Sequence, residues 1–358
     1  MRIAVVDVAA QSSGALSVLN DFVDTLVEQE SGTEDEWFII TSIVDTNEAN
    51  NIHNIKYPEI KRSWLHRLWW DYSSFRRLVK KLKVDLVFSL QNNGLPTKKL
   101  KQVVYFHNVL LVQHSFKFSF RVKAERILAI YSRILGPYIR YSWKNADAII
   151  VQGDSVKQQV GRYFPMSQIY VCKPKVKMEQ QTIAVGKIKG FIYPATALKY
   201  KNFEMIIEAV KKLEEAGRQT EILFTISGNE NTYAERIKKE AEKTKSIKLI
   251  GYQNREFILE KYKEYGLIIT SRLESFPVPI REAMCCQTVI VALDLAYVLD
   301  FTQSALYNRL HIAQDNIDSL VLAMQEALSD EEKGNYVLKD EEDSMKQLIN
   351  ILKEAVAE

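Results

Sequence analysis

The chain has few cysteines and no long apolar segment. Only three of its 358 residues are cysteine, Cys172 and the adjacent pair Cys285 and Cys286, and adjacent cysteines seldom meet disulfide geometry. We therefore expect a reducing compartment. No Cys/His spacing resembles a zinc site, so no structural metal is expected. No run of about 18 apolar residues occurs, and Asp7 interrupts the N-terminal apolar run too early for a signal peptide, so the sequence predicts a cytoplasmic protein.

Short apolar or β-branched segments alternate with amphipathic helical segments over most of the chain. This pattern is typical of successive βα units with parallel sheets. Apolar residues make up 47% of the sequence and charged residues 26%, which is the composition of a foldable globular protein. Because 358 residues exceed one ordinary core, we expect an α/β fold with two domains of about 150 to 180 residues.

The expected elements fall into two series. The first contains the strands Arg2–Val8, Trp37–Ile43, Leu86–Leu90, Gln102–Phe106, Ala148–Val151 and Ile169–Cys172. The second contains Phe191–Tyr193, Glu221–Ser227, Ile247–Ile250, Leu267–Thr270 and Thr288–Ala292. The polar, lysine-rich passage Lys173–Lys189 between them is the expected linker. We therefore place an N-terminal domain at residues 1–175, a C-terminal domain at 186–335, and at 341–358 a helix that packs back on the first domain.

The segment Glu274–Glu282 places two carboxylates eight positions apart across a proline-bounded turn that leads into an apolar helix. Pro279 suits the first helical position, so Glu282 is expected in the first turn and Glu274 in the preceding loop. Backbone N–H groups at a helix start favour a diphosphate, and nearby carboxylates accept hydrogen bonds from ribose and hexose hydroxyls. The alternative is that Glu282 is only a helix-start acid and Glu274 a solvated loop residue.

This segment and a second one resemble the retaining glycosyltransferases of family 4, the glycosyl transferases group 1. Residues 274–292, ESFPVPIREAMCCQTVIVA, follow the donor-site signature of that family. Residues 193–203, YPATALKYKNF, match the family's loop after a strand of the donor domain. The resemblance covers nearly the whole chain. It implies the GT-B architecture, in which two Rossmann-like domains with parallel sheets face a central cleft.

The resemblance also implies roles for individual residues. Glu274 would contact the donor sugar at the catalytic centre, Glu282 would bind the ribose hydroxyls, and Lys201 would neutralise the donor diphosphate. The other donor-binding positions that it implies are Phe276, Val278 and Pro279 in the same segment, and Gly228 in a turn that borders the nucleotide base.

The sequence departs from the family pattern at two positions. Pro277 stands where the family commonly has glycine, and proline removes a backbone N–H that would face phosphate. Thr196 stands where an arginine is expected, so the diphosphate loses a bidentate donor. Lys199, Arg272 or Arg281 could compensate. These departures keep open the alternative of a non-catalytic sugar-nucleotide-binding GT-B protein or partner subunit.

Two sites are expected in the first domain. Gly14 lies in a loop between a strand and a helix, which the family uses near the donor phosphate; because it is the only glycine there, an NAD or FAD site is disfavoured. A plain strand-to-helix turn is the alternative. His107 follows a strand, where open α/β sheets place ligands, and resembles the family's histidine near the reacting centre. A lone histidine is more often structural, which is its alternative.

The expected reaction needs no cofactor beyond the nucleoside-diphosphate sugar that serves as donor. No Asp-x-Asp triplet occurs, which agrees with a site that uses no metal. The resemblance implies transfer of a hexose-type sugar, with retention, to a hydroxyl of a lipid-linked saccharide in bacterial surface polysaccharide synthesis, such as capsule or lipopolysaccharide. A sugar-nucleotide epimerase on the same plan is a further alternative, but no acid/base pair for it stands out.

The first half of the chain is strongly basic. Between residues 61 and 144 the only acidic residues are Asp71, Asp85 and Glu125, although the net charge of the whole chain is only +3. Aromatic residues are interleaved with the basic ones at 61–83 and 116–144, a composition that suits anionic lipid headgroups. No helix-turn-helix or RNA-binding signature favours nucleic acid. We expect peripheral association with the inner face of the cell membrane through these two segments.

Overall fold

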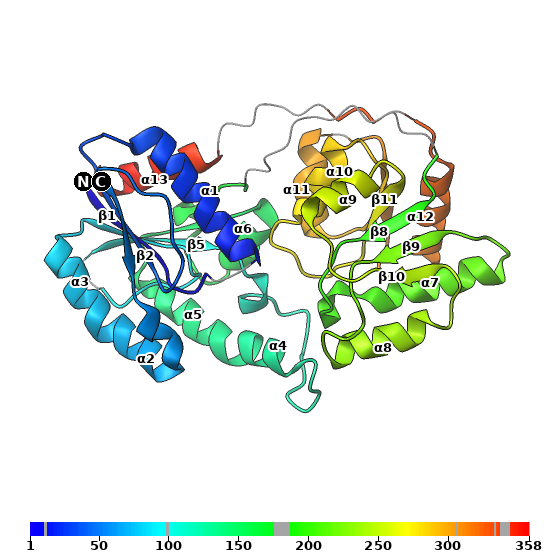
Figure 1. Cartoon of the computed structure of the whole chain (residues 1–358), viewed down its shortest axis with the longest axis horizontal. Helices are drawn as coiled ribbons and strands as arrows, with labels where there is room; N and C mark the ends of the chain where they lie inside the picture. The colour runs from blue at the N-terminus through cyan, green and yellow to red at the C-terminus, as the bar shows by residue number, and fades with distance from the viewer. Residues whose placement is uncertain are drawn as a thin grey trace. The chain divides into compact units, whose positions relative to one another are not determined.

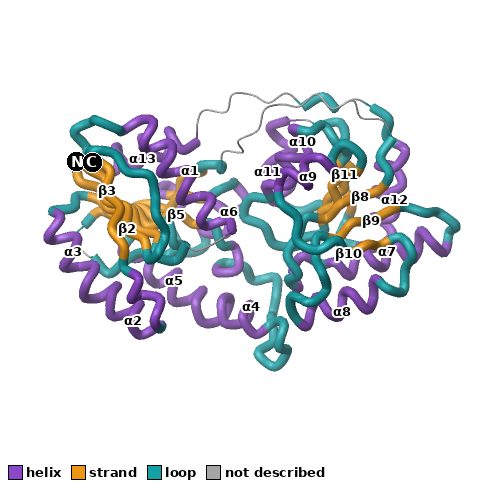
Figure 2. Tube along the Cα trace, in the orientation of Figure 1, coloured by secondary structure: helices purple, strands orange, loops and turns teal. Residues whose placement is uncertain are grey.

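The computed structural model describes residues 1–10, 13–97, 100–174, 187–305, 307–332, 334–336 and 344–357 (Figures 1 and 2). The chain divides into two compact units. The first comprises Met1–Phe116, Tyr131–Lys175 and Asp340–Glu358, and the second comprises Lys117–Ile130 and Val176–Lys339. Most of the expected linker, residues 175–186, lies outside the described part of the chain.

The first unit is built on a seven-stranded sheet in the order β3-β2-β1-β4-β5-β6-β7, with every neighbouring pair parallel. Its strands are β1 (Arg2–Asp7), β2 (Glu36–Thr41), β3 (Ile52–Lys56), β4 (Leu86–Ser89), β5 (Lys101–Phe106), β6 (Ala148–Val151) and β7 (Ile169–Val171). Its helices are α1 (Ser13–Glu30), α2 (Trp64–Trp69), α3 (Phe75–Leu82), α5 (Gly136–Ser142), α6 (Asp154–Val160) and α13 (Ser344–Ala357), while α4 (Arg126–Ile130) is counted with the second unit.

Both faces of this sheet are covered, because successive strand residues point to opposite sides. Ile3 and Val5 of β1 pack with helix α1 and with Met345, Leu348 and Leu352 of α13. The other face, from Ala4 and Val6, packs with Phe75 and Val79 of α3. In Figure 1, α1 and α13 lie side by side on one face. The C-terminal helix is therefore part of the first unit's core.

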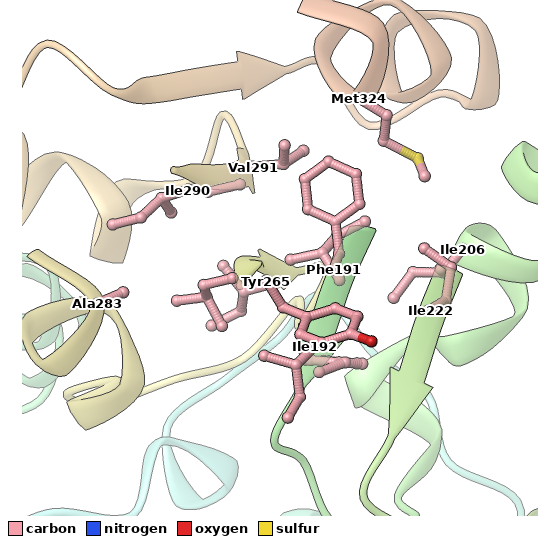
Figure 3. Packing of buried hydrophobic residues seen from close by; sticks show 14 of the residues in the cluster. Phe191, Ile192, Ile206, Ile222, Tyr265, Ala283, Ile290, Val291 and Met324 are labelled. Carbon is pink, nitrogen blue, oxygen red and sulfur yellow. The ribbon is translucent and has the colours of Figure 1, made fainter. Parts of the chain in front are cut away.

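The second unit is built on a six-stranded parallel sheet in the order β10-β9-β8-β11-β12-β13. Its strands are β8 (Gly190–Tyr193), β9 (Glu221–Phe224), β10 (Ile247–Leu249), β11 (Tyr265–Ile269), β12 (Ile290–Leu293) and β13 (Leu310–Ala313). Its helices are α7 (Phe203–Glu215), α8 (Thr232–Ala241), α9 (Arg255–Lys261), α10 (Val278–Cys285), α11 (Ala296–Ala305) and α12 (Ile317–Ser329). Figure 3 shows side chains of β8, β9, β11 and β12 packed with those of α7, α10 and α12.

The predicted α/β class, with two Rossmann-like parallel sheets, is confirmed. The expectation was incomplete at the sheet edges, because β3 and β13 were not predicted. Both are edge strands whose polar residues, such as His53 in β3 and His311 in β13, interrupt the apolar pattern.

The strand order fixes where ligands are expected in each unit. In the second sheet the chain runs outward from β8 to β10 and then returns to place β11 beside β8. In the first sheet the corresponding reversal lies between β1 and β4. Open α/β sheets bind ligands outside the carboxyl ends of the strands at this switch point. The loops after β8 and β11 carry Lys201 and Glu274, and the loop after β1 leads to Gly14. His107 and Gly228 follow β5 and β9, each one strand away from a switch point.

Candidate functional site

Lys201 and Glu274 meet at the switch point of the second unit. Lys201 lies in a short helical turn after β8, and Glu274 lies in the loop after β11. Lys201 Nζ donates directly to Glu274 Oε1, and both side chains are 16% exposed. A pair that is mostly shielded from water interacts more strongly than a surface pair. The structure thus brings together the two residues that the sequence assigned to diphosphate and sugar.

The loops that carry this pair are joined by hydrogen bonds. The backbone N–H of Arg272 donates to the carbonyl of Tyr200 at 2.8 Å. The hydroxyl of Thr270 donates to the carbonyl of Lys201 at 3.2 Å, and the buried phenol of Tyr193 donates to the same carbonyl at 2.7 Å. These bonds hold the two loops together and fix the backbone next to both charged side chains.

The charge of Glu274 acts on three tyrosines. Burial, and to a smaller extent the negative charge of Glu274, raises the pKa of Tyr193, Tyr200 and Tyr297 above its ordinary value. The phenols therefore stay neutral at physiological pH and act as hydrogen-bond donors. Tyr297 already donates to the carbonyl of Ser271 at 2.6 Å, which fixes the start of the Glu274 loop.

Glu282 is buried and paired with Arg255. The Glu282 side chain is 7% exposed, and Arg255 Nε, at the first residue of α9, lies 2.5 Å from its Oε1. Burial raises the pKa of Glu282, and the guanidinium opposes that rise. The sequence reasoning missed Arg255. Its signal was a cation in the first turn of a helix, where the helix dipole disfavours positive charge and some other interaction must hold it.

The start of α10 differs from the expectation. The helix begins at Val278, so Pro279 is its second residue and Glu282 lies beyond the first turn. The N–H of Val278 donates to Phe276 O and that of Ile280 to Pro277 O, both at 3.0 Å. Since Pro277 and Pro279 have no N–H, this helix start has fewer backbone donors for a diphosphate than a helix start without prolines. The Phe276 ring packs 4.8 Å from that of Phe301, and Val278 is 37% exposed.

Gly228 forms a turn that only glycine accommodates easily. Its φ is +85°, and an added Cβ would lie 2.8 Å from Lys238 Cβ in α8. Its N–H donates to Glu230 Oε2 at 2.9 Å, and the N–H of Ser227 donates to the other oxygen of that carboxylate. The backbone donors of this turn are therefore already occupied by Glu230.

The residues considered as substitutes for the arginine absent at Thr196 are already engaged. Lys199 Nζ is 2.6 Å from Glu204 Oε1, and Arg272 Nη2 is 2.8 Å from Asp315 Oδ1. The Arg281 guanidinium lies 5.3 Å from the centre of the Tyr336 ring. Unlike these three residues, Lys201 is paired with a predicted site residue, Glu274.

The first unit carries the other predicted residues, His107 and Gly14. His107 directly follows β5, and burial lowers the pKa of its imidazole to about 4, so it is neutral at pH 7. Gly14 lies in the first turn of α1; residues 11 and 12 of its loop lie outside the described part of the chain. Within the described residues, no group of three or more His, Cys, Asp or Glu is placed to hold a metal ion.

The basic, aromatic segments are only partly exposed. Trp70, Phe118 and Trp143 are buried, so they do not contribute to the exposed surface of these segments. Arg140 donates to the carbonyl of Leu111, so part of its guanidinium is engaged within the protein. The exposed large side chains of the first unit in these segments are Trp69, Tyr72, Tyr131, Ile134, Tyr138 and Tyr141.

A small pocket of about 160 Å³ lies within this exposed group of the first unit. Its lining includes Tyr72, Tyr138 and Tyr141, together with the basic residues Arg76 and Lys144.

Among the helices that the structure describes, none is long and apolar enough to cross a membrane.

The chain is similar to one protein family and to several solved structures. Residues 174–342 match the family described as Glycosyl transferases group 1. Sucrose-phosphate synthase from Thermosynechococcus elongatus has a similar structure, with a TM-score of 0.67, 14% identity, and coverage of 99% of this chain and 96% of that one. Anabaena Alr3699/HepE, solved with UDP and glucose, is similar with a TM-score of 0.60 and 14% identity, over 92% of this chain and 90% of that one. WaaG, a glycosyltransferase involved in lipopolysaccharide biosynthesis, is similar with a TM-score of 0.60 and 10% identity, over 99% of this chain and 94% of that one.

The chain therefore has the GT-B fold, and its second unit is similar to the group 1 glycosyl transferases. Identities of 10–14% establish the fold rather than the reaction. A search of the curated protein sequences finds no match to the chain.

Proposed function

We propose that the protein is a retaining glycosyltransferase that moves a hexose from a nucleoside-diphosphate sugar to a saccharide hydroxyl. The observation that carries this proposal is the pairing of Lys201 with Glu274 at the switch point of the second sheet. A cation and an anion in that place match the two parts of the donor, a charged diphosphate and a hydroxyl-rich sugar. The family match over the same region supports it.

In this proposal the donor diphosphate displaces Glu274 as the partner of Lys201. The released carboxylate then accepts hydrogen bonds from the sugar hydroxyls. As the glycosidic bond breaks, negative charge grows on the leaving diphosphate, and the Lys201 ammonium stabilises it without a metal ion. Because hydrogen bonds join the backbones of the two loops, only the two side chains have to move apart.

Glu282 is proposed to accept hydrogen bonds from the ribose hydroxyls. It must be ionised to accept from both, and its burial opposes ionisation. Arg255 counters that penalty and is therefore part of the proposed ribose site. The exposed Val278 and the adjacent Pro279 are proposed to line the donor, Phe276 to support them from the core, and Gly228 to shape the turn near the base.

Two further parts of the proposal concern the first unit. His107 and Gly14 are proposed to contact the sugar and donor phosphate, since both follow carboxyl ends of strands. The exposed aromatic group with Arg76 and Lys144 is proposed to lie on an anionic membrane surface and present a lipid-linked acceptor. A role in bacterial surface polysaccharide synthesis, at the cytoplasmic side of the membrane, would follow, and the likeness to WaaG supports it.

The test is calorimetric titration with UDP, GDP and their hexose conjugates, followed by NMR of the anomeric proton during turnover with simple glycoside acceptors. We expect binding of one nucleotide and a product with the donor's anomeric configuration. An inverted product would contradict the retaining mechanism, and no binding of any sugar nucleotide would contradict the enzyme proposal.

One alternative has structural support. With Thr196 in place of an arginine, and with Lys199 and Arg272 paired elsewhere, the diphosphate clamp consists of a single lysine. Such a clamp suits a protein that binds sugar nucleotides without turning them over. This alternative would be favoured if the wild-type protein binds a nucleotide tightly but transfers no sugar to any acceptor at saturating donor concentrations.

A further inference from the structure

The Asn92 carboxamide makes two contacts with His107. Asn92 follows β4 and His107 follows β5, so the two residues stand side by side at the carboxyl ends of paired strands. Asn92 Oδ1 accepts from the backbone N–H of His107 at 2.8 Å. Asn92 Nδ2 lies 3.3 Å from His107 Nε2.

The first contact fixes the direction of the second. A carboxamide turned the other way would set its NH₂ group against the backbone N–H of His107, two donors facing each other. The oxygen therefore faces the backbone, and the NH₂ group faces Nε2. Because the NH₂ group can only donate, Nε2 must be the imidazole nitrogen without a proton. A neutral imidazole carries one N–H, so the proton of His107 lies on Nδ1.

Asn92 is itself held in place. Its φ is +70°, a region that asparagine tolerates better than most residues. The indole N–H of the buried Trp143 donates to the carbonyl of Asn92 at 2.9 Å. In the next residue, the carbonyl of Asn93 accepts from the hydroxyl of Ser89 at 2.7 Å. The carboxamide thus projects from a rigid loop.

The other imidazole nitrogen, Nδ1, takes no part in the contact with Asn92. His107 Nδ1 is buried and has no hydrogen-bond partner among the described residues. A buried donor without a partner is unfavourable, and a ligand oxygen would relieve it. His107 follows β5, which lies one strand away from the switch point between β1 and β4, where a substrate is expected.

We propose that Asn92 is a positioning residue that holds His107 as the neutral Nδ1–H tautomer, so that Nδ1–H donates a hydrogen bond to a sugar oxygen. His107 then acts as a fixed donor, not as a base that removes a proton from the acceptor. The tautomer follows from the contacts alone, whereas the sugar as its ligand rests on the proposed function.

The test uses two variants that add the same charge to the same loop. Asn92→Asp keeps an oxygen for the backbone N–H of His107 but replaces the NH₂ group with a second oxygen, which accepts a hydrogen bond from Nε2–H. Aspartate also tolerates the positive φ. Asn93→Asp is the matched control, since the Asn93 side-chain amide donates to the Gly94 carbonyl and not to His107.

The tautomer is read by long-range ¹H–¹⁵N NMR of the ligand-free protein, with His107→Gln identifying the signals. We expect Nδ1–H in the wild type and in Asn93→Asp, and a proton on Nε2 in Asn92→Asp. A proton on Nε2 in the wild type, or an Nδ1–H pattern that Asn92→Asp leaves unchanged, would overturn the assignment. This readout does not require enzymatic activity, so it stands apart from the proposed function.

The role of His107 as a hydrogen-bond donor is tested by measuring kcat/KM. Retained nucleotide binding shows that each variant is folded. We expect Asn92→Asp to lose about 10- to 100-fold relative to Asn93→Asp, the size of one lost hydrogen bond to the reacting sugar. Equal activities of the two variants would overturn the donor role. Absence of transferase activity in the wild type would overturn both the donor role and the proposed function, while leaving the measured tautomer.

Discussion

Lys201 and Glu274 neutralise each other across 73 positions of sequence, at the point where β8 and β11 lie side by side. The pair links the two halves of the proposed donor site. A ligand that binds Lys201 must compete with Glu274, and a ligand that binds Glu274 must compete with Lys201. In the proposed function, a nucleoside-diphosphate sugar would satisfy both groups at once, so that one molecule can separate the pair.

The ribose site predicts a specific loss of discrimination. An ionised Glu282 accepts hydrogen bonds from ribose hydroxyls, so UDP or GDP should bind more tightly than its 2′-deoxy counterpart by about 1.5–3 kcal/mol. In Glu282→Gln this difference should shrink because the amide accepts less strongly. The measurement is calorimetry of both nucleotides with both proteins. Equal preference for ribose in wild type and variant would exclude Glu282 as the ribose contact.

Arg255 should affect the same discrimination indirectly. Without its guanidinium, burial would raise the pKa of Glu282 further, so more of the carboxyl is protonated at a given pH. We expect Arg255→Gln to bind the ribonucleotide increasingly well as pH rises, while the wild type changes less. Lys261→Gln, which removes a cation from the other end of α9, is the control. A flat pH profile for Arg255→Gln would show that the ion pair does not control Glu282.

Asp7, at the end of β1, predicts a pH-dependent stability. Burial raises the pKa of its carboxyl from 3.8 to about 6, opposed by hydrogen bonds from Ala10 and Ala9 and by Arg67 and Lys61. Between these values the folded chain binds more protons than the unfolded one, so Asp7 lowers the free energy of unfolding as pH rises through 6.

Asp7→Asn mimics the protonated form and keeps the oxygen that accepts from the N–H of Ala10. We expect it to be about 2–3 kcal/mol more stable than the wild type at pH 8 and nearly equal at pH 4, by urea unfolding followed with a first-unit probe. A variant that is less stable than the wild type at pH 8 would show that the carboxylate charge is needed by its basic neighbours.

The proposed membrane face predicts a selective loss of vesicle binding. Ile134 is 57% exposed in the first unit, beside Tyr131 and Tyr138, and Leu322 is 60% exposed on α12 of the second unit. Ile134→Asp should reduce co-sedimentation with anionic vesicles several-fold, because it removes apolar area and adds a repelled charge. Leu322→Asp should leave binding unchanged. Equal loss in both variants, or no binding by the wild type at low salt, would contradict this surface.

The sequence predicted the interior strands well because strands buried on both faces are continuous apolar runs, as in Ala148–Val151. The edge strands β3 and β13 carried no such run. The motif at 274–282 singled out Glu274 and Glu282, but it could not reveal Arg255 as the partner of Glu282. Arg255 lies 27 positions from Glu282, and Asn92 lies 15 positions from His107. Such pairs arise from the order of strands in a sheet, which local sequence patterns do not encode.

The central claim is tested most directly by the affinity for the nucleoside diphosphate alone, measured in parallel for Lys201→Gln and Glu274→Gln. Removing the lysine should weaken binding about 10- to 100-fold, because it removes the cation that holds the diphosphate. Removing the glutamate charge should leave this affinity unchanged or raise it, because Lys201 loses its competitor, while sugar transfer falls. Weakening by both substitutions to the same extent would contradict the account.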